Sequence, residues 1–226
     1  MVFIDMAHKE ITLKLVYYGP ALSGKTTNLQ QLHGCLQGQG NTDGELVTLN
    51  TRNDRTLFFD LLPLRLSIRG GLCIRVKLFT VPGQVIHNTT RKIVLQGADG
   101  VAFIADSRIS QTRANNESFA NLRTNLRDNG IAMSEIGVVI QFNKRDLPGI
   151  RSDEEVAKIR AKGAEPVYAA TAVGGHGVIE TFLGLASSSW RKLDRRFGFE
   201  ERFAVTHDEV MTELGRSLGD EGAAWR

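Results

Sequence analysis

The sequence has few cysteines, no long apolar run and little excess charge, and each shortage narrows the class of protein. Two cysteines, Cys35 and Cys73, give no metal-binding spacing and no disulfide framework, which favours a reducing compartment. No apolar run approaches the roughly 18 residues of a membrane span. The net charge is only +3, and the basic residues are not interleaved with aromatic ones, so nothing indicates nucleic-acid binding.

The two ends of the sequence carry no recognisable targeting signal. Residues 1–5 lack the charged and apolar regions of a signal peptide, Val2 excludes myristoylation, and residues 223–226 do not form a prenylation signal. The length of 226 residues and the hydrophobic fraction of 42% are ordinary for one soluble domain. We therefore expect a cytoplasmic protein with no membrane span and no lipid anchor.

The most informative segment is Gly19-Pro20-Ala21-Leu22-Ser23-Gly24-Lys25-Thr26. It fits the pattern G-x-x-x-x-G-K-[ST], between an apolar run at 11–18 that predicts a strand and a helical pattern from 27. Backbone N–H groups of such a loop surround phosphate oxygens, and the helix N-terminus adds partial positive charge. Lys25 would reach the outer phosphates, and Thr26 would ligate Mg²⁺. The competing interpretation is a glycine-rich turn with a solvated lysine. The predicted contact residues are Gly19, Ala21, Leu22, Ser23, Gly24, Lys25, Thr26 and Thr27.

Strand and helix patterns alternate along the rest of the chain, which predicts an α/β fold with a mostly parallel sheet. Residues 64–69 and 72–79 alternate with period two on either side of Gly70-Gly71, a signal for an antiparallel hairpin at one edge. The continuous apolar runs at 101–105 and 137–142 are typical of central parallel strands covered on both faces.

Two further segments follow predicted strands directly. Residues 80–84, Thr-Val-Pro-Gly-Gln, place Gly83 where its N–H can meet a γ-phosphate and Gln84 where it can orient an attacking water. Residues 143–146, Asn-Lys-Arg-Asp, place Asp146 where its carboxylate can accept the N1–H and N2 amine of guanine, a donor pair that adenine lacks. Each segment alone is an ordinary turn. Their order along the chain, each at a strand's C-terminal end, favours a ligand site there.

A third segment, Ala170-Thr171-Ala172, follows the predicted strand at 166–170. We expect backbone N–H groups of Thr171 and Ala172 to close the pocket around the base. With these segments in this order, the chain resembles Ras-like small GTPases. More narrowly it resembles the MglA family of bacterial polarity and motility GTPases. The similarity rests on residues 17–20, 54–60, 80–84 and 141–148 and covers roughly residues 1–195.

The resemblance implies a P-loop NTPase fold of the Ras-like type. Its three-layer α/β sandwich contains a mostly parallel sheet of six to seven strands and one antiparallel hairpin edge. It implies a GTPase domain at residues 1–195, followed by a C-terminal helical extension at 196–226 that packs on the domain or is tethered to it. Within that extension, Thr206-x-x-Glu209 is a capping box that predicts a last short helix.

The resemblance also implies roles for residues that the patterns alone do not assign. Thr56 would contact both Mg²⁺ and the γ-phosphate, Arg55 would be a built-in arginine finger, and Gln84 would position the water. Thr80, where most Ras-like proteins have Asp, is typical of the MglA type. The implied cofactors are GTP/GDP and Mg²⁺, with Thr26 and Thr56 as metal ligands. Asn143, Lys144 and Asp146 would hold the base. The implied partners are a roadblock-fold GTPase-activating protein of the MglB type and polarity or motility effectors at a cell pole.

One position departs from the family pattern. The third loop position, usually glycine, is Ala21, and in Ras-like proteins a side chain there crowds the catalytic glutamine. A GTP-hydrolysing switch therefore competes with a second interpretation, a GTP-dependent binding module with little intrinsic hydrolysis. A small-molecule kinase is a third interpretation, but it would need a basic lid after the central strands, and the sequence has none.

Overall fold

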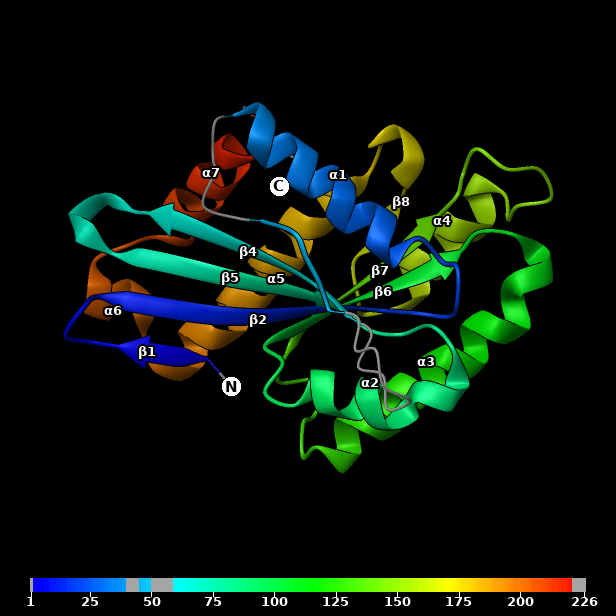
Figure 1. The fold of residues 1–226 in the computed structure, drawn as a ribbon, viewed down its shortest axis with the longest axis horizontal. Coiled ribbons are helices and arrows are strands. Elements are labelled where there is room, and N and C mark those ends of the chain that lie inside the picture. Colours follow the sequence, from blue (N-terminus) through cyan, green and yellow to red (C-terminus); the bar gives the residue numbers. More distant parts are fainter. Residues whose placement is uncertain (1, 40–44, 50–58, 221–226) are drawn as a thin grey trace.

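A computed structural model describes residues 2–39, 45–49 and 59–220, which fold around one twisted sheet (Figure 1). The long strand β2 (Glu10–Tyr18) lies near the middle of this sheet, with parallel neighbours on both sides. Seven strands follow one another in the order β3 (Val47–Leu49), β4 (Phe59–Ser67), β5 (Cys73–Thr80), β2 (Glu10–Tyr18), β6 (Gly100–Asp106), β7 (Gly137–Asn143) and β8 (Val167–Ala169).

Two antiparallel pairs, β3–β4 and β4–β5, lie on the β5 side of β2. Strand β4 pairs with β5 through a short turn at Arg69–Gly71, in which Gly70 and Gly71 both have positive φ. Strand β3 pairs with the other edge of β4, and the three-residue strand β1 (Phe3–Asp5) pairs with β2. The predicted α/β fold with a mostly parallel sheet and one antiparallel edge is confirmed, whereas β1 was not anticipated.

Helices cover both faces of the sheet and complete three layers. Helices α1 (Lys25–Gly38), α5 (Val178–Phe197) and α7 (His207–Ser217) pack on one face, and α2 (Asn88–Leu95), α3 (Thr112–Asp128) and α4 (Asp153–Lys162) pack on the other. The alternating side chains of each strand contribute to two separate apolar cores, one on each face. In Figure 1, α1 and α7 lie above the sheet and α2 and α3 below it. Helix α6 spans Phe199–Phe203. Short 3₁₀ turns span Val85–His87, Ile109–Gln111 and Ala172–Gly174.

The last two helices pack against α5. The Phe199 ring lies 5.1 Å from that of Trp190, and Ser187 Oγ lies 2.8 Å from His207 Nε2. Thr206 and Glu209 form the capping box at the start of α7. The division of the chain after residue 195 stays a prediction. No helix in the described part of the chain has the length and hydrophobicity needed to cross a membrane.

Candidate nucleotide-binding site

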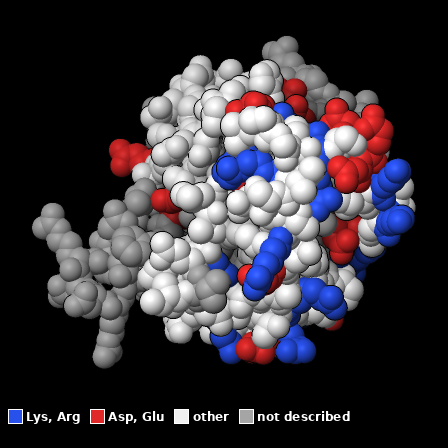
Figure 2. Space-filling view, turned by 90° about the vertical axis from the view of Figure 1, so that its right-hand side faces the viewer, with Lys and Arg blue, Asp and Glu red and all other residues white. Residues whose placement is uncertain are grey.

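The C-terminal ends of the parallel strands meet at one edge of the sheet, and the predicted binding segments follow them. Strands β6 and β7 point toward the right of Figure 1, and Figure 2 shows that side of the molecule. Basic side chains gather across the middle and lower part of this face with a few acidic ones among them, while the largest acidic cluster lies toward the upper right in Figure 2. The face is therefore suited to an anionic ligand.

The loop between β2 and α1 has the backbone geometry of an anion site. Gly24 precedes α1 with φ 98°, a left-handed conformation that favours glycine, and among the described residues no side-chain cap is found at the start of α1. A Cβ on Gly24 would lie only 2.1 Å from Asn143 Nδ2, so the loop is pressed against the end of β7. The uncapped N–H groups of α1 are left for a ligand.

Lys25 is a buried cation at the centre of this loop. Its side chain is 7% exposed, and Nζ donates to the carbonyl oxygens of Gly19 at 3.2 Å and Pro20 at 2.7 Å. Burial, together with the nearby charge of Arg91, lowers the pKa of Lys25 to about 7. No carboxylate among the described residues forms an ion pair with it. A buried ammonium of this kind is stabilised by an anion, so the loop fits a phosphate.

A carboxylate that the sequence analysis did not single out lies beside Thr26. Asp60 Oδ2 accepts hydrogen bonds from Thr26 Oγ1 at 2.7 Å and from Thr80 Oγ1 at 3.0 Å. The backbone N–H of Asp60 in turn donates to Thr80 Oγ1 at 2.9 Å. These oxygens are the hard ligands that Mg²⁺ prefers. Asp60 thus offers the negative charge that Thr80 cannot, and the cluster fits a magnesium ion completed by phosphate oxygens.

Asp60→Asn is expected to weaken Mg²⁺-dependent retention of bound nucleotide. Replacing the carboxylate that Thr26 contacts should raise the Mg²⁺ concentration for half-maximal retention about 10- to 100-fold, the usual cost of losing an outer partner of a metal ligand. Release of a fluorescent GDP analogue across a Mg²⁺ titration measures this. Asp128→Asn, the same change at a carboxylate paired with Lys92, is the matched control. Identical Mg²⁺ dependence in the Asp60 and Asp128 variants would remove Asp60 from the metal site.

The Pro82–Gly83 segment after β5 lies directly against the phosphate loop. A Cβ on Gly83 would lie 2.3 Å from Ala21 Cα and 2.9 Å from Pro20 O, contacts that only glycine permits in this arrangement. Gln84 follows with an exposed side chain. The structure therefore places Gln84 beside the phosphate loop. The backbone of Gly83, which precedes it, has no room to move closer to that loop.

Arg91 anchors this segment from behind. The residue is 1% exposed; Nε donates to Pro82 O at 2.8 Å, and Nη2 donates to Gly83 O at short range. Its Nη1 donates to Asn121 Oδ1 at 2.9 Å, and the group lies over the Tyr18 ring. Sequence reasoning missed Arg91, because nothing in the pattern of α2 distinguishes a buried arginine from a solvated one.

Asn143 ties the expected base-binding segments to the phosphate loop. Its Nδ2 donates to Ser23 O at 2.8 Å, and its Oδ1 accepts the N–H of Ala172 at 2.9 Å. Asp146 is exposed in the turn that follows. The N–H of Thr171 donates to His176 O at 2.9 Å. Both N–H groups therefore already donate within the protein. Contacts of Thr171 and Ala172 with the base would have to replace these hydrogen bonds, so they stay predictions.

Lys144 is held by a carboxylate at the end of the neighbouring strand. Its Nζ lies 2.8 Å from Asp106 Oδ2, which also pairs with Arg108 at 2.6 Å. Burial raises the pKa of Asp106, but hydrogen bonds from Arg108 and Lys144 outweigh it and bring the pKa to about 2. Asp106 therefore remains ionised at neutral pH and fixes the direction of the Lys144 side chain.

The structure brings most of the predicted site residues together, but two of them lie outside the described part of the chain. The phosphate loop, Gly83, Gln84 and the segments at 143–146 and 171–172 meet at one edge of the sheet. Arg55 and Thr56 lie outside the described residues, so their predicted roles are not tested by this geometry. Leu22 is 86% exposed with φ 59°, so it contributes backbone rather than side chain to the loop.

Comparison with known proteins extends the similarity beyond these segments. No family model matches the chain. The "Mutual gliding-motility protein MglA" of Myxococcus xanthus (strain DK1622) is 47% identical over 186 residues, which is 82% of this chain and 94% of that protein. The similarity therefore covers nearly the whole relative rather than isolated nucleotide-binding motifs.

Proposed function

Because this chain belongs to the MglA family of small GTPases, we propose that it is a molecular switch that cycles between GTP and GDP to regulate cell polarity and gliding motility. The observation that carries the proposal is the convergence at Asn143, which joins the phosphate loop to the base-binding segments through Ser23 and Ala172. A nucleotide bound along this line would have phosphates at Lys25 and its base at Asp146. The gliding role follows the printed name of the Myxococcus relative.

In the proposed hydrolysis, some residues bind the phosphates and another positions the attacking water. Lys25 and the N–H groups of the loop hold the β- and γ-phosphates, while Gln84 orients a water for attack on the γ-phosphorus. The bond from that phosphorus to the β–γ bridging oxygen breaks, giving GDP and inorganic phosphate. Arg55 stabilises the charge that builds up on the transferred group. Thr26 and Thr56, with Asp60 behind Thr26, would hold Mg²⁺, which neutralises phosphate charge when bound.

We further propose that hydrolysis is slow until a roadblock-fold activating protein of the MglB type binds, and that the GTP form acts on motility or polarity effectors at a cell pole. Exposed Gln84 supports this, because an exposed side chain must be ordered before it can position water. Turnover of GTP by the full chain, with and without a co-encoded roadblock-fold protein, tests the proposal. Binding of guanine nucleotide with no turnover under either condition would leave only a GTP-dependent binding module.

That second candidate has one specific observation in its favour. Backbone atoms of Ala21 lie against Gly83, the residue before Gln84, so the part of the loop nearest the catalytic segment carries a methyl group that glycine would lack. A displacement near 1 Å at a reacting centre can cost about 10²-fold in rate. If Gln84 cannot reach the water past this methyl group, the protein would bind GTP and release it largely unhydrolysed.

Ala21→Gly is expected to raise partner-stimulated hydrolysis, by up to about 10²-fold, with little change in GTP affinity. The affinity should hold because ground-state contacts come from loop N–H groups and Lys25, which the methyl group does not touch. Single-turnover hydrolysis and nucleotide dissociation rates measure the two effects separately. Ala120→Gly, an alanine-to-glycine change at an exposed position in α3, controls for backbone loosening. Equal turnover for wild type and Ala21→Gly would mean that the chain has adapted to the methyl group and would favour an ordinary switch.

A further inference from the structure

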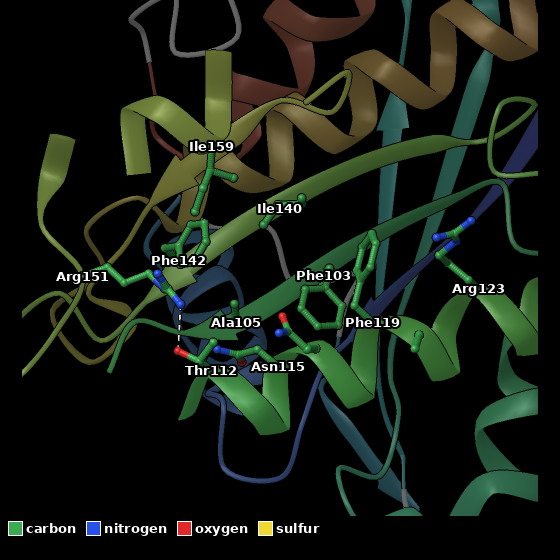
Figure 3. Close-up of a pocket in the computed structure, with 12 residues that line it drawn as sticks. Phe103, Ala105, Thr112, Asn115, Phe119, Arg123, Ile140, Phe142, Arg151 and Ile159 are labelled. Atoms are coloured by element: carbon green, nitrogen blue, oxygen red, sulfur yellow. Dashed lines mark hydrogen bonds between the residues drawn. The ribbon is translucent and has the colours of Figure 1, made fainter. Parts of the chain in front are cut away.

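A groove runs along α3 on the side away from α2. Its first part is a cavity of about 520 Å³ between α3 and α4, over β6 and β7 (Figure 3). A second cavity of about 680 Å³ adjoins it toward the C-terminal end of α3. Ala120 and Arg123 line both cavities, so the two form one continuous surface.

The floor of the groove is apolar. Phe119, Ile140 and Ile159 are half-buried at the edge of the second core, and Figure 3 shows them facing the same space from α3, β7 and α4. Phe119 is fixed edge-on against Phe103, with ring centroids 5.0 Å apart. Ile131 and Met133 extend the apolar lining into the second cavity. The floor is thus a set of ordered side chains with one face left uncovered.

The rim carries positive charge that pairs with none of the described residues. Arg123 and Arg127 are exposed, and within the described part of the chain neither side chain makes a hydrogen bond or ion pair. Neighbouring carboxylates are already engaged: Glu117 pairs with Arg113 at 2.7 Å, and Asp128 pairs with Lys92 at 3.2 Å.

The opposite end of the groove is held in place internally. Arg151 Nη2 donates to Thr112 Oγ1 at 2.7 Å, the dashed line in Figure 3, and its Nη1 lies 3.8 Å from Glu155 Oε1. This contact joins the loop before α4 to the first turn of α3. Along this groove, the positive charge without a partner in residues 2–39, 45–49 and 59–220 is therefore that of Arg123 and Arg127.

We propose that this groove binds an acidic amphipathic helical segment of a partner protein. Apolar side chains at i, i+4 and i+7 would enter the floor, and carboxylates beside them would pair with Arg123 and Arg127. From Thr112 to Arg127 the helix rises roughly 22 Å at 1.5 Å per residue, about four turns, which suits a peptide better than one small molecule. The surface contains none of the predicted nucleotide contacts, so it goes beyond the proposed switch.

A synthetic helical peptide of about four turns, with leucines along one face and glutamates flanking them, is the probe. Fluorescence anisotropy against the full chain loaded with GDP should give saturable binding. Arg123→Glu combined with Arg127→Glu should weaken it about tenfold, because each exposed pair contributes modestly and both are reversed. The matched control is Arg195→Glu, the same charge reversal at an exposed arginine in the last turn of α5, which should leave binding unchanged.

Two further measurements separate the contributions of shape and charge. Ala120→Trp should abolish most binding by filling the groove at an exposed position, and nucleotide affinity shows that each variant is folded. A peptide with every glutamate replaced by glutamine should bind more weakly to wild type and equally to wild type and the double variant. Lack of saturable binding, equal binding of both peptides, or binding that survives Ala120→Trp would each overturn the proposal. So would binding of a free aromatic carboxylate in place of the peptide.

Discussion

Asp146→Asn is expected to change the base preference of this protein from guanine to xanthine nucleotides. The wild-type carboxylate accepts two hydrogen bonds from guanine N1–H and its 2-amino group. Xanthine has a carbonyl oxygen in place of that amine, and an amide at 146 can donate to this oxygen while accepting N1–H. A site built around polar pairing rejects the mismatched base by about 10⁴-fold, because a buried group is then left unpaired.

Competition of GDP, XDP and ADP against a labelled nucleotide measures this preference. Asp153→Asn is the matched control, since Asp153 is an exposed carboxylate that pairs with Arg145 and lies at the start of α4. It should keep the wild-type order, with GDP bound far more tightly than XDP or ADP. If wild type bound ADP as tightly as GDP, or if Asp146→Asn still preferred GDP, Asp146 would not be the base-reading residue.

The sequence was sufficient for most of the fold, because the fold depends on local periodicity. Continuous apolar runs identified β6 and β7, and period-two alternation around Gly70-Gly71 identified β4 and β5. Strand β1 was missed because three residues are too few to carry a period. It forms only because β2 extends beyond β6 and offers an unpaired edge at Glu10–Thr12.

The sequence predicted those site residues that belong to a recognisable motif. It did not predict the residues that reach the site through pairing between neighbouring strands. Asp60 reaches Thr80 because β4 and β5 are antiparallel, with Leu61 opposite Phe79, a register that spacing along the chain does not reveal. A signal for it existed: Thr80 replaces the usual carboxylate, so a metal site there needs negative charge from elsewhere. No sequence pattern indicated Arg91, because its role depends on its burial against Tyr18 and on the positions of the Pro82 and Gly83 carbonyls.

The contacts of Arg91 and Ala21 show which part of residues 80–84 is held in place. The sequence placed Gly83 where its N–H can meet a γ-phosphate and Gln84 where it can orient an attacking water. In the structure, Arg91 holds the carbonyls of Pro82 and Gly83, and the backbone of Ala21 leaves no room for a Cβ on Gly83. Because the backbone of Pro82 and Gly83 is held in place, we expect the movement needed for catalysis to come from the side chain of Gln84 and from any residue that joins it at the γ-phosphate.

Arg55→Ala is expected to lose about 10³-fold of the partner-stimulated GTP turnover while GTP affinity changes little, because an arginine finger acts on charge that develops only in the transition state. Arg52→Ala, the same change three residues earlier in the same segment, should retain stimulated turnover. Arg55→Lys should recover only part of the loss, since lysine keeps the charge but not the planar pair of donors.

The same assay shows whether Arg55 and Gln84 act together. Gln84→Leu should lose a similar factor, because the leucine cannot orient water. Since groups that stabilise one transition state as a unit are not additive, the double variant should be scarcely slower than either single one. Multiplicative losses would mean independent roles. Undiminished stimulated turnover in Arg55→Ala would mean that the arginine finger comes from the activating partner, and Gln84 would then position the water without help from Arg55.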